Sequence, residues 1–123
     1  MESYWLRGIR GATSVEEDEK EGILVSTEEL LSAMLEANNL DDYEVIAAIF
    51  FTSTPDLVSA FPAEAARHLG LSLVPLLCFQ EIPVIGSIPR VIRIMIQVNT
   101  TKRQDEIKHI YLGDASALRP DLV

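Results

Sequence analysis

Hydrophobic residues recur at every second position between residues 91 and 98, a spacing that predicts a β-strand with two different faces. One face is aliphatic and consists of Ile92, Ile94, Ile96 and Val98. The other face is mixed and consists of Val91, Arg93, Met95 and Gln97. A mixed face of this kind suits a pocket or a subunit interface better than open water.

Helical spacing replaces alternation between residues 23 and 35. The apolar positions on one predicted face are Ile23, Thr27, Leu30, Leu31, Met34 and Leu35. Cap-type residues and acids at positions 13–18 predict the helix start, and Asn38 and Asn39 mark its end. A second, short helix is predicted between Pro62 and Gly70, because proline favours the first turn of a helix and glycine its end.

Other apolar runs bounded by turn-forming residues predict further strands at residues 4–12, 45–52, 73–79, 110–112 and 115–118. The run at 45–52 is nearly continuous, which is typical of a central strand covered on both faces. Residues 104–109 predict a helical turn, and residues 83–89 an irregular loop. This alternation predicts an α/β or α+β sheet with helices on one side.

Composition limits the function classes. A length of 123 residues predicts one domain spanning residues 1–123. The formal net charge of −9 argues against nucleic acid or an anionic membrane as the partner. No apolar stretch reaches transmembrane length, and the N-terminal residues do not resemble a signal peptide. Cys78 is the only cysteine, so we expect no internal disulfide and a reduced, cytoplasmic setting.

Arg93 is the most informative residue, because a guanidinium inside an apolar strand is costly without an anionic partner. That partner is either a carboxylate of the protein or a bound one. Glu81 is the natural internal candidate, since it ends the preceding strand and is joined to the Arg93 strand by one loop. A structural Glu81–Arg93 ion pair and an anion site formed by Arg10, Arg93 and Arg67 both remain open at this point.

Other chemistry is less well supported. A nucleophilic site that uses Cys78, with His68 or His109 as its base, is not favoured, because no family signature surrounds the cysteine. A lone cysteine in a strand is usually a small buried residue. Two histidines without spaced carboxylates or thiols do not predict a metal site. The glycines around Arg10 lack the spacing of a phosphate-binding loop. We therefore expect no metal and no cofactor.

Seven segments in the order of a known family carry a resemblance from end to end of the chain. They are residues 7–13 (RGIRGAT) with 15–16 (VE), 54–57 (TPDL), 60–63 (AFPA) with 65–67 (AAR), 74–75 (VP) with 78–81 (CFQE), 86–93 (GSIPRVIR), 109–112 (HIYL) and 118–122 (LRPDL). In these segments the chain resembles the chorismate mutases of the small trimeric α/β class, which are distinct from the all-helical class. The resemblance implies an α+β fold, with a mixed sheet packed against one long helix and short helices, assembled as a homotrimer. It also implies conversion of chorismate to prephenate in aromatic amino acid biosynthesis.

The resemblance assigns three catalytic residues. Arg93 is expected to contact the ether oxygen and one carboxylate of chorismate, and Arg10 to bind a carboxylate. Glu81 is expected to be ionised, to pair with the arginines and to accept a hydrogen bond from the substrate hydroxyl. The remaining substrate-binding residues that it implies are Tyr111, Cys78, Phe61, Arg67, Leu118 and Arg119.

The resemblance assigns these substrate-binding residues to different parts of the site. Tyr111 supports Arg10 with its hydroxyl, and Cys78 contacts the same region as Glu81. Phe61 packs on the substrate from a neighbouring subunit, and Arg67 lies at the entrance. Leu118 and Arg119 help to close the pocket.

Two alternatives come from other function classes. Trimeric enamine/imine deaminases share the architecture and an interface arginine, although the segments 78–81 and 89–93 fit them poorly. A non-catalytic carboxylate-binding module, in which Glu81 only neutralises Arg93, would bind chorismate without consuming it.

Overall fold

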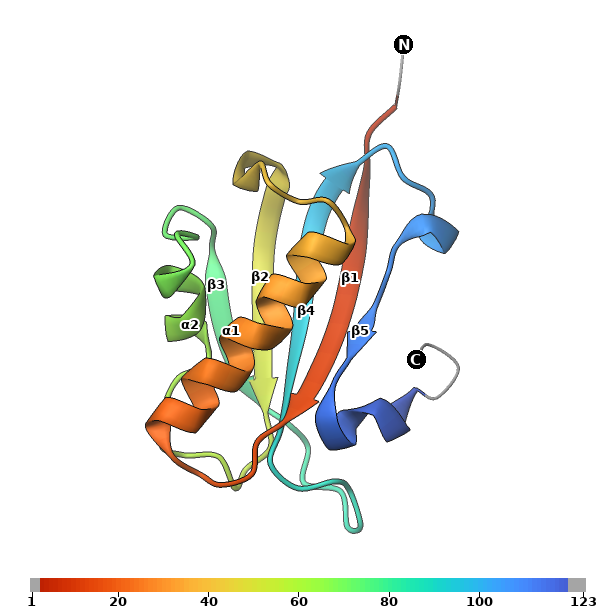
Figure 1. The fold of residues 1–123 in the computed structure, drawn as a ribbon. Coiled ribbons are helices and arrows are strands. Elements are labelled where there is room, and N and C mark those ends of the chain that lie inside the picture. Colours follow the sequence, from red (N-terminus) through yellow and green to blue (C-terminus); the bar gives the residue numbers. More distant parts are fainter. Residues whose placement is uncertain (1–2, 120–123) are drawn as a thin grey trace.

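The computed structural model describes residues 3–119, and these form one mixed sheet with helices on one face (Figure 1). Across the sheet the five strands of this part of the chain lie in the order β3-β2-β4-β1-β5. Their bounds are β1 (Trp5–Ser14), β2 (Ile46–Ser53), β3 (Leu76–Gln80), β4 (Val91–Thr100) and β5 (Ile110–Tyr111). Strand β4 is antiparallel to both of its neighbours, β1 and β2, whereas β3 and β5 pair in parallel at the two edges. The α+β prediction is therefore confirmed.

Helix α1 (Lys20–Ala37) crosses one face of the sheet diagonally, and the short helix α2 (Ala63–His68) lies beside it near β3 (Figure 1). The predicted apolar face of α1 is the buried one. It packs on the aliphatic face of β4, whose four residues are all buried. Each large aliphatic side chain fully buried in this way contributes about 1.5–3 kcal/mol relative to an exposed one.

Close approach of α1 to β1 depends on Gly11. A Cβ atom at this position would collide with the Met34 sulfur and would lie 3.1 Å from the Ile110 carbonyl oxygen. The neighbours of Gly11 in β1, Arg10 and Ala12, therefore face the opposite side of the sheet.

Several boundaries differ from those predicted. Residues 13 and 14, predicted as helix caps, belong to β1, because Ser14 pairs with Val91 and its hydroxyl accepts a hydrogen bond from the Asp114 N–H. Helix α1 instead begins after Glu19, whose side chain makes no capping hydrogen bond.

The predicted strand at 115–118 is wrong. These residues lie in the 3₁₀ helix η3 (Gly113–Leu118). Gly113 has a positive φ of 57°, which turns the chain out of β5, and the Ala115 N–H then bonds the Leu112 carbonyl as in a helical turn. The turn predicted at 104–109 is present as the 3₁₀ helix η2 (Gln104–Glu106), and a third such turn is η1 (Tyr43–Val45).

Within residues 3–119, neither α-helix covers the sheet face opposite α1, here called the open face (Figure 1). Only the 3₁₀ helix η3 packs on one end of this face, against Ala12 and Val91. The prediction that residues 45–52 are covered on both faces fails within one chain, since Ala47 is exposed and Phe50 is only partly buried. Further towards the edge, Leu77 and Phe79 of β3 are 56% and 50% exposed. The mixed character predicted for the Arg93 side of β4 is present, with Val91 buried and Arg93, Met95 and Gln97 partly exposed.

No helix within residues 3–119 combines the length and the apolar character needed to cross a bilayer.

Candidate active site

Strand pairing brings three predicted site residues together on the open face. Arg93 of β4 lies opposite Ala12 of β1, and Ala12 lies opposite Tyr111 of β5. Arg10 precedes Ala12 by two positions and therefore points to the same side. The side chains of Arg10, Arg93 and Tyr111 line one cavity of about 170 Å³. Residues that are 18 to 101 positions apart in the chain thus form one cationic pocket because of the sheet order.

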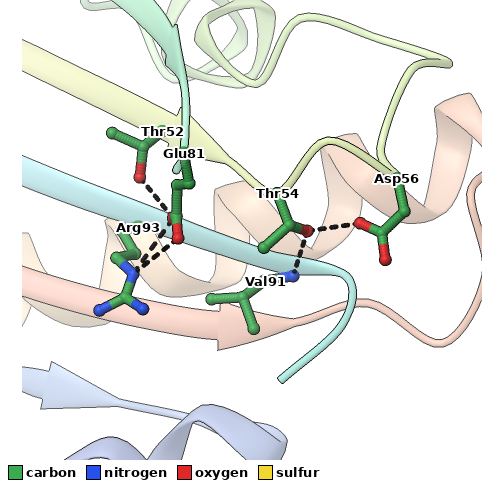
Figure 2. Close-up of polar contacts among 6 residues, drawn as sticks. All are labelled: Thr52, Thr54, Asp56, Glu81, Val91 and Arg93. Atoms are coloured by element: carbon green, nitrogen blue, oxygen red, sulfur yellow. Dashed lines mark hydrogen bonds and ion pairs between the residues drawn. The ribbon is translucent and has the colours of Figure 1, made fainter. Parts of the chain in front are cut away.

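Glu81 is paired with Arg93, as the sequence predicted. The Arg93 Nε–H donates to both carboxylate oxygens of Glu81, each at 3.1 Å (Figure 2). The Glu81 N–H bonds the Ser53 carbonyl at 2.9 Å, which extends the pairing of β3 with β2 and holds Glu81 over the Arg93 side of the sheet. The Glu81 side chain is 14% exposed and that of Arg93 38%, so the pair is partly shielded from water.

The pairing leaves part of the guanidinium available. Both terminal nitrogens of Arg93 point away from Glu81 in Figure 2, and no side chain or carbonyl within residues 3–119 accepts a hydrogen bond from them. An internal ion pair and a donor group for a bound anion therefore coexist in one residue. The two possibilities left open by the sequence are compatible.

Arg10 is held through its backbone. Its N–H donates to Nδ1 of His109 at 2.9 Å, just before the short pairing of β1 with β5. Burial lowers the pKa of His109, and the positive charges of Arg10 and Arg119 lower it further. A neutral imidazole with an acceptor at Nδ1 is therefore favoured. Sequence analysis had considered His109 only as a base for Cys78 or as a metal ligand, and had supported neither role.

The C-terminal part of the described chain lies beside this pocket. Tyr111 is buried in a small cluster with Ala12, Val91 and Ala115, and Leu118 packs against that cluster. Arg119 follows and acts electrostatically on His109. Residues 120–122, the remainder of the family-like segment 118–122, lie outside the described residues.

Phe61 and Cys78 lie elsewhere. They line a separate cavity of about 420 Å³ together with Lys20, Phe79 and Gln80. Cys78 pairs with Phe51, whose side chain is buried under α1, so Cys78 points to the helix side of the sheet. Within one chain Cys78 and Arg93 therefore lie on opposite faces of the sheet, and the contact of Cys78 with the same region as Glu81 stays a prediction. Arg67, in the last turn of α2, is exposed and lines neither cavity.

A hydrogen-bonded clamp fixes the start of β4 (Figure 2). The Thr54 hydroxyl donates to the Asp56 carboxylate at 2.5 Å and accepts from the Val91 N–H at 3.0 Å. The same carboxylate accepts from the Arg90 N–H at 3.0 and 3.2 Å, where the chain passes through a positive φ of 51°. Arg93 lies two residues after Val91 in the same strand, so the clamp sets the position of the strand that carries it.

Sequence reasoning did not identify Thr52. Its hydroxyl donates to Oε2 of Glu81 at 2.6 Å (Figure 2). Thr52 lies directly opposite Arg93 in the pairing of β2 with β4. Only this pairing reveals the contact, because the sequence gives the faces of each strand but not the register between strands.

Comparison with known proteins supports one family. The family model described as chorismate mutase type I matches residues 6–122. The chain is 57% identical over 117 residues to the chorismate mutase AroH of Thermus thermophilus, covering 95% of this chain and 96% of that protein. It is 45% identical over 118 residues to the chorismate mutase AroH of Bacillus subtilis (strain 168), covering 95% and 92% of the two chains.

A solved structure, the chorismate mutase from Clostridium thermocellum Cth-682, has the same fold with a TM-score of 0.88 and 44% identity. The match covers 90% of this chain and 98% of that one. The resemblance inferred from the sequence motifs is confirmed. Neither the imine deaminase alternative nor the non-catalytic module is supported by these matches.

Proposed function

The chain belongs to the chorismate mutase type I family, and we propose that it converts chorismate to prephenate at a pocket built around the guanidinium of Arg93. The enzyme class is that of an isomerase. Within one molecule a carbon–oxygen bond breaks and a carbon–carbon bond forms. The step balances without a nucleophile, a transferred proton or a redox partner.

Such a reaction is accelerated in two ways. The flexible substrate is held in the compact conformer that brings the reacting carbons together, and a fixed positive charge meets the negative charge that grows on the ether oxygen. Chorismate is a dianion, so cations also bind it before it reacts. The observation that carries the proposal is the orientation of Arg93, whose Nε is held by Glu81 while its terminal nitrogens point away from that carboxylate (Figure 2).

The role of each site residue follows from the charged group of the substrate that it contacts. We assign Arg93 to the ether oxygen and to one carboxylate, since a planar guanidinium can donate to both through its terminal nitrogens. Arg10 and the Tyr111 hydroxyl bind a carboxylate in the cavity that they line together with Arg93. Glu81 orients Arg93 and accepts from the substrate hydroxyl.

We further propose that the pocket is completed by a second copy of the chain in a homotrimer. Phe61 and Cys78 line a different cavity from Arg93 within one chain, so they contribute to its site only from a neighbour. The open face supports this arrangement. It presents exposed Leu77 and Phe79 on an edge strand, next to a loop at residues 81–90 that projects beyond the sheet (Figure 1).

Arg67 and the tail residues Leu118 and Arg119 are proposed to border the completed site. The reaction is proposed to take place in the cytoplasm, where a reducing setting suits the single unpaired thiol of Cys78.

The direct test is loss of the ultraviolet absorbance of chorismate when pure protein is added, with prephenate identified by proton NMR. Catalytic turnover, with many moles of product for each mole of protein, is the expected result. Saturable binding of chorismate without turnover would instead identify a non-catalytic module. Arg93→Ala, prepared in parallel, controls for a contaminating host enzyme.

A further inference from the structure

Thr52 makes a contact to Glu81 that the roles proposed above do not use. Its hydroxyl donates to Oε2 at 2.6 Å, while the Arg93 Nε–H reaches both Oε1 and Oε2 at 3.1 Å. The carboxylate is thus held from two sides by two residues that lie opposite each other on β2 and β4. We propose that Thr52 is a positioning residue that fixes the Glu81 carboxylate and, through it, the Arg93 guanidinium. This inference rests on the proposed function.

The alternative geometry shows why the hydroxyl matters. A carboxylate facing a guanidinium commonly forms two parallel hydrogen bonds, one of which uses a terminal nitrogen. In this structure the carboxylate centres on Nε, and neither terminal nitrogen donates to Glu81. The Thr52 hydroxyl holds Oε2 in that position. Without the Thr52 hydroxyl, the Glu81 carboxylate can rotate into the arrangement with two parallel hydrogen bonds. It would then bind a terminal N–H of Arg93 that the transition state needs.

The strand itself does not require a hydroxyl at this position. Threonine and valine have the same shape and both favour β-strands. Thr52 also lines the cavity of Arg10, Arg93 and Tyr111, so its contact to Glu81 is made beside the proposed substrate pocket.

The test compares Thr52→Val and Thr52→Ser with the wild-type enzyme in steady-state kinetics on chorismate. Loss of one hydrogen bond to a charged group is expected to lower kcat about tenfold in Thr52→Val and to change KM much less, while Thr52→Ser retains most of the wild-type kcat. Thr100→Val is the matched control. Within residues 3–119 the Thr100 hydroxyl accepts only from the Lys102 N–H, at the far end of β4. The kinetic constants of Thr100→Val should therefore equal those of the wild-type enzyme.

A double-mutant cycle with Glu81→Gln separates positioning from a direct or structural role. If Thr52 acts through the carboxylate, Thr52→Val should add little to the loss already caused by Glu81→Gln. If Thr52→Val lowers kcat by the same factor in the wild-type and Glu81→Gln proteins, the proposal is wrong. A wild-type kcat in Thr52→Val would also overturn it. Should Thr52→Val not fold, Thr52→Ala replaces it with the same expected result.

The activity of the wild-type protein on chorismate distinguishes failure of the positioning role from failure of the proposed function. If the wild-type protein does not turn over chorismate, the function itself is wrong. If it does and Thr52→Val is equally active, only the positioning role is wrong.

Discussion

The backbone N–H of Arg10 donates a 2.9 Å hydrogen bond to Nδ1 of His109, which joins β1 to the segment that enters β5. Nδ1 accepts this bond only while it carries no proton. Burial lowers the pKa of His109 from its ordinary value of 6.5, and the charges of Arg10 and Arg119 lower it further. The folded protein therefore favours the neutral imidazole more strongly than the unfolded chain does.

We predict that the free energy of unfolding decreases as the pH is lowered through the range in which His109 takes up a proton. As the pH drops below 6.5, His109 becomes protonated in the unfolded chain but stays neutral in the folded chain. The free energy of unfolding therefore decreases until the pH falls below the lowered pKa of the folded state. His109→Asn offers an acceptor near the Nδ1 position and does not titrate. Its melting temperature should fall less than that of wild type between pH 7.5 and 5. Parallel curves for the two proteins would show that His109 does not contribute.

The clamp at the start of β4 provides a prediction about stability. Thr54→Val keeps the shape of the side chain but leaves the buried Val91 N–H without its acceptor. An unsatisfied buried donor costs about 1–3 kcal/mol of unfolding free energy. Urea unfolding at one fixed protein concentration measures this loss, with Thr101→Val, at an exposed position, as the control. Equal stability of Thr54→Val and wild type would mean that the clamp is dispensable.

The order of strands along the sheet is what the sequence could not supply. Alternation around Arg93 predicted its strand and both faces correctly, because side-chain direction follows directly from the period of two. The position of Arg93 beside Thr52 and in line with Tyr111 depends on pairing between segments far apart in the chain. Local patterns carry no information about that pairing unless a turn fixes it.

The misassigned segment at 115–118 has a related cause. The short segment Ala-Ser-Ala-Leu fits a strand or a helical turn equally well, and Gly113 with its positive φ decides in favour of the turn. The Glu81–Arg93 pair, in contrast, could be predicted, because an arginine within an apolar strand needs an acceptor and Glu81 ends the preceding strand, one loop away.

Cys78 tests whether the chemistry needs a nucleophile. The thiol is exposed and unpaired in one chain. Cys78→Ser is expected to keep kcat within about tenfold of wild type, since only a weak polar contact changes. Complete loss of turnover in a folded Cys78→Ser protein would contradict the proposed rearrangement.

Sharing of the site between subunits predicts complementation. Arg93→Ala and Phe61→Glu should each be nearly inactive alone, because they damage opposite halves of the same composite site. Refolding the two variants together in equal amounts should restore about a quarter of the wild-type sites, those that pair an intact Arg93 with an intact Phe61. Mass photometry of the mixture checks that it is trimeric. No recovery in mixed trimers would contradict a site that combines Arg93 of one subunit with Phe61 of another.

Arg93 and Arg10 should differ in which kinetic constant they affect. Arg93 is proposed to meet charge that appears only in the transition state, so its loss should lower kcat by at least about 10² to 10³ while KM changes less. Arg10 is proposed to hold a carboxylate that is charged from the start. More of its loss should therefore appear in KM. Arg103, an exposed arginine paired with Asp105, is the control, and Arg103→Lys should leave both constants unchanged.

Charge can be separated from shape at position 93. Arg93→citrulline keeps the planar side chain and removes the positive charge, so it should show nearly the full loss of kcat. Arg93→Lys restores the charge but not the geometry, because Glu81 is centred on Nε and an ammonium cannot pair there and still present two terminal donors to the pocket. Its rate should recover only in part. If the citrulline protein turns over chorismate at nearly the wild-type kcat, the positive charge of Arg93 is not what lowers the barrier, and the catalysis must come from holding the compact conformer alone.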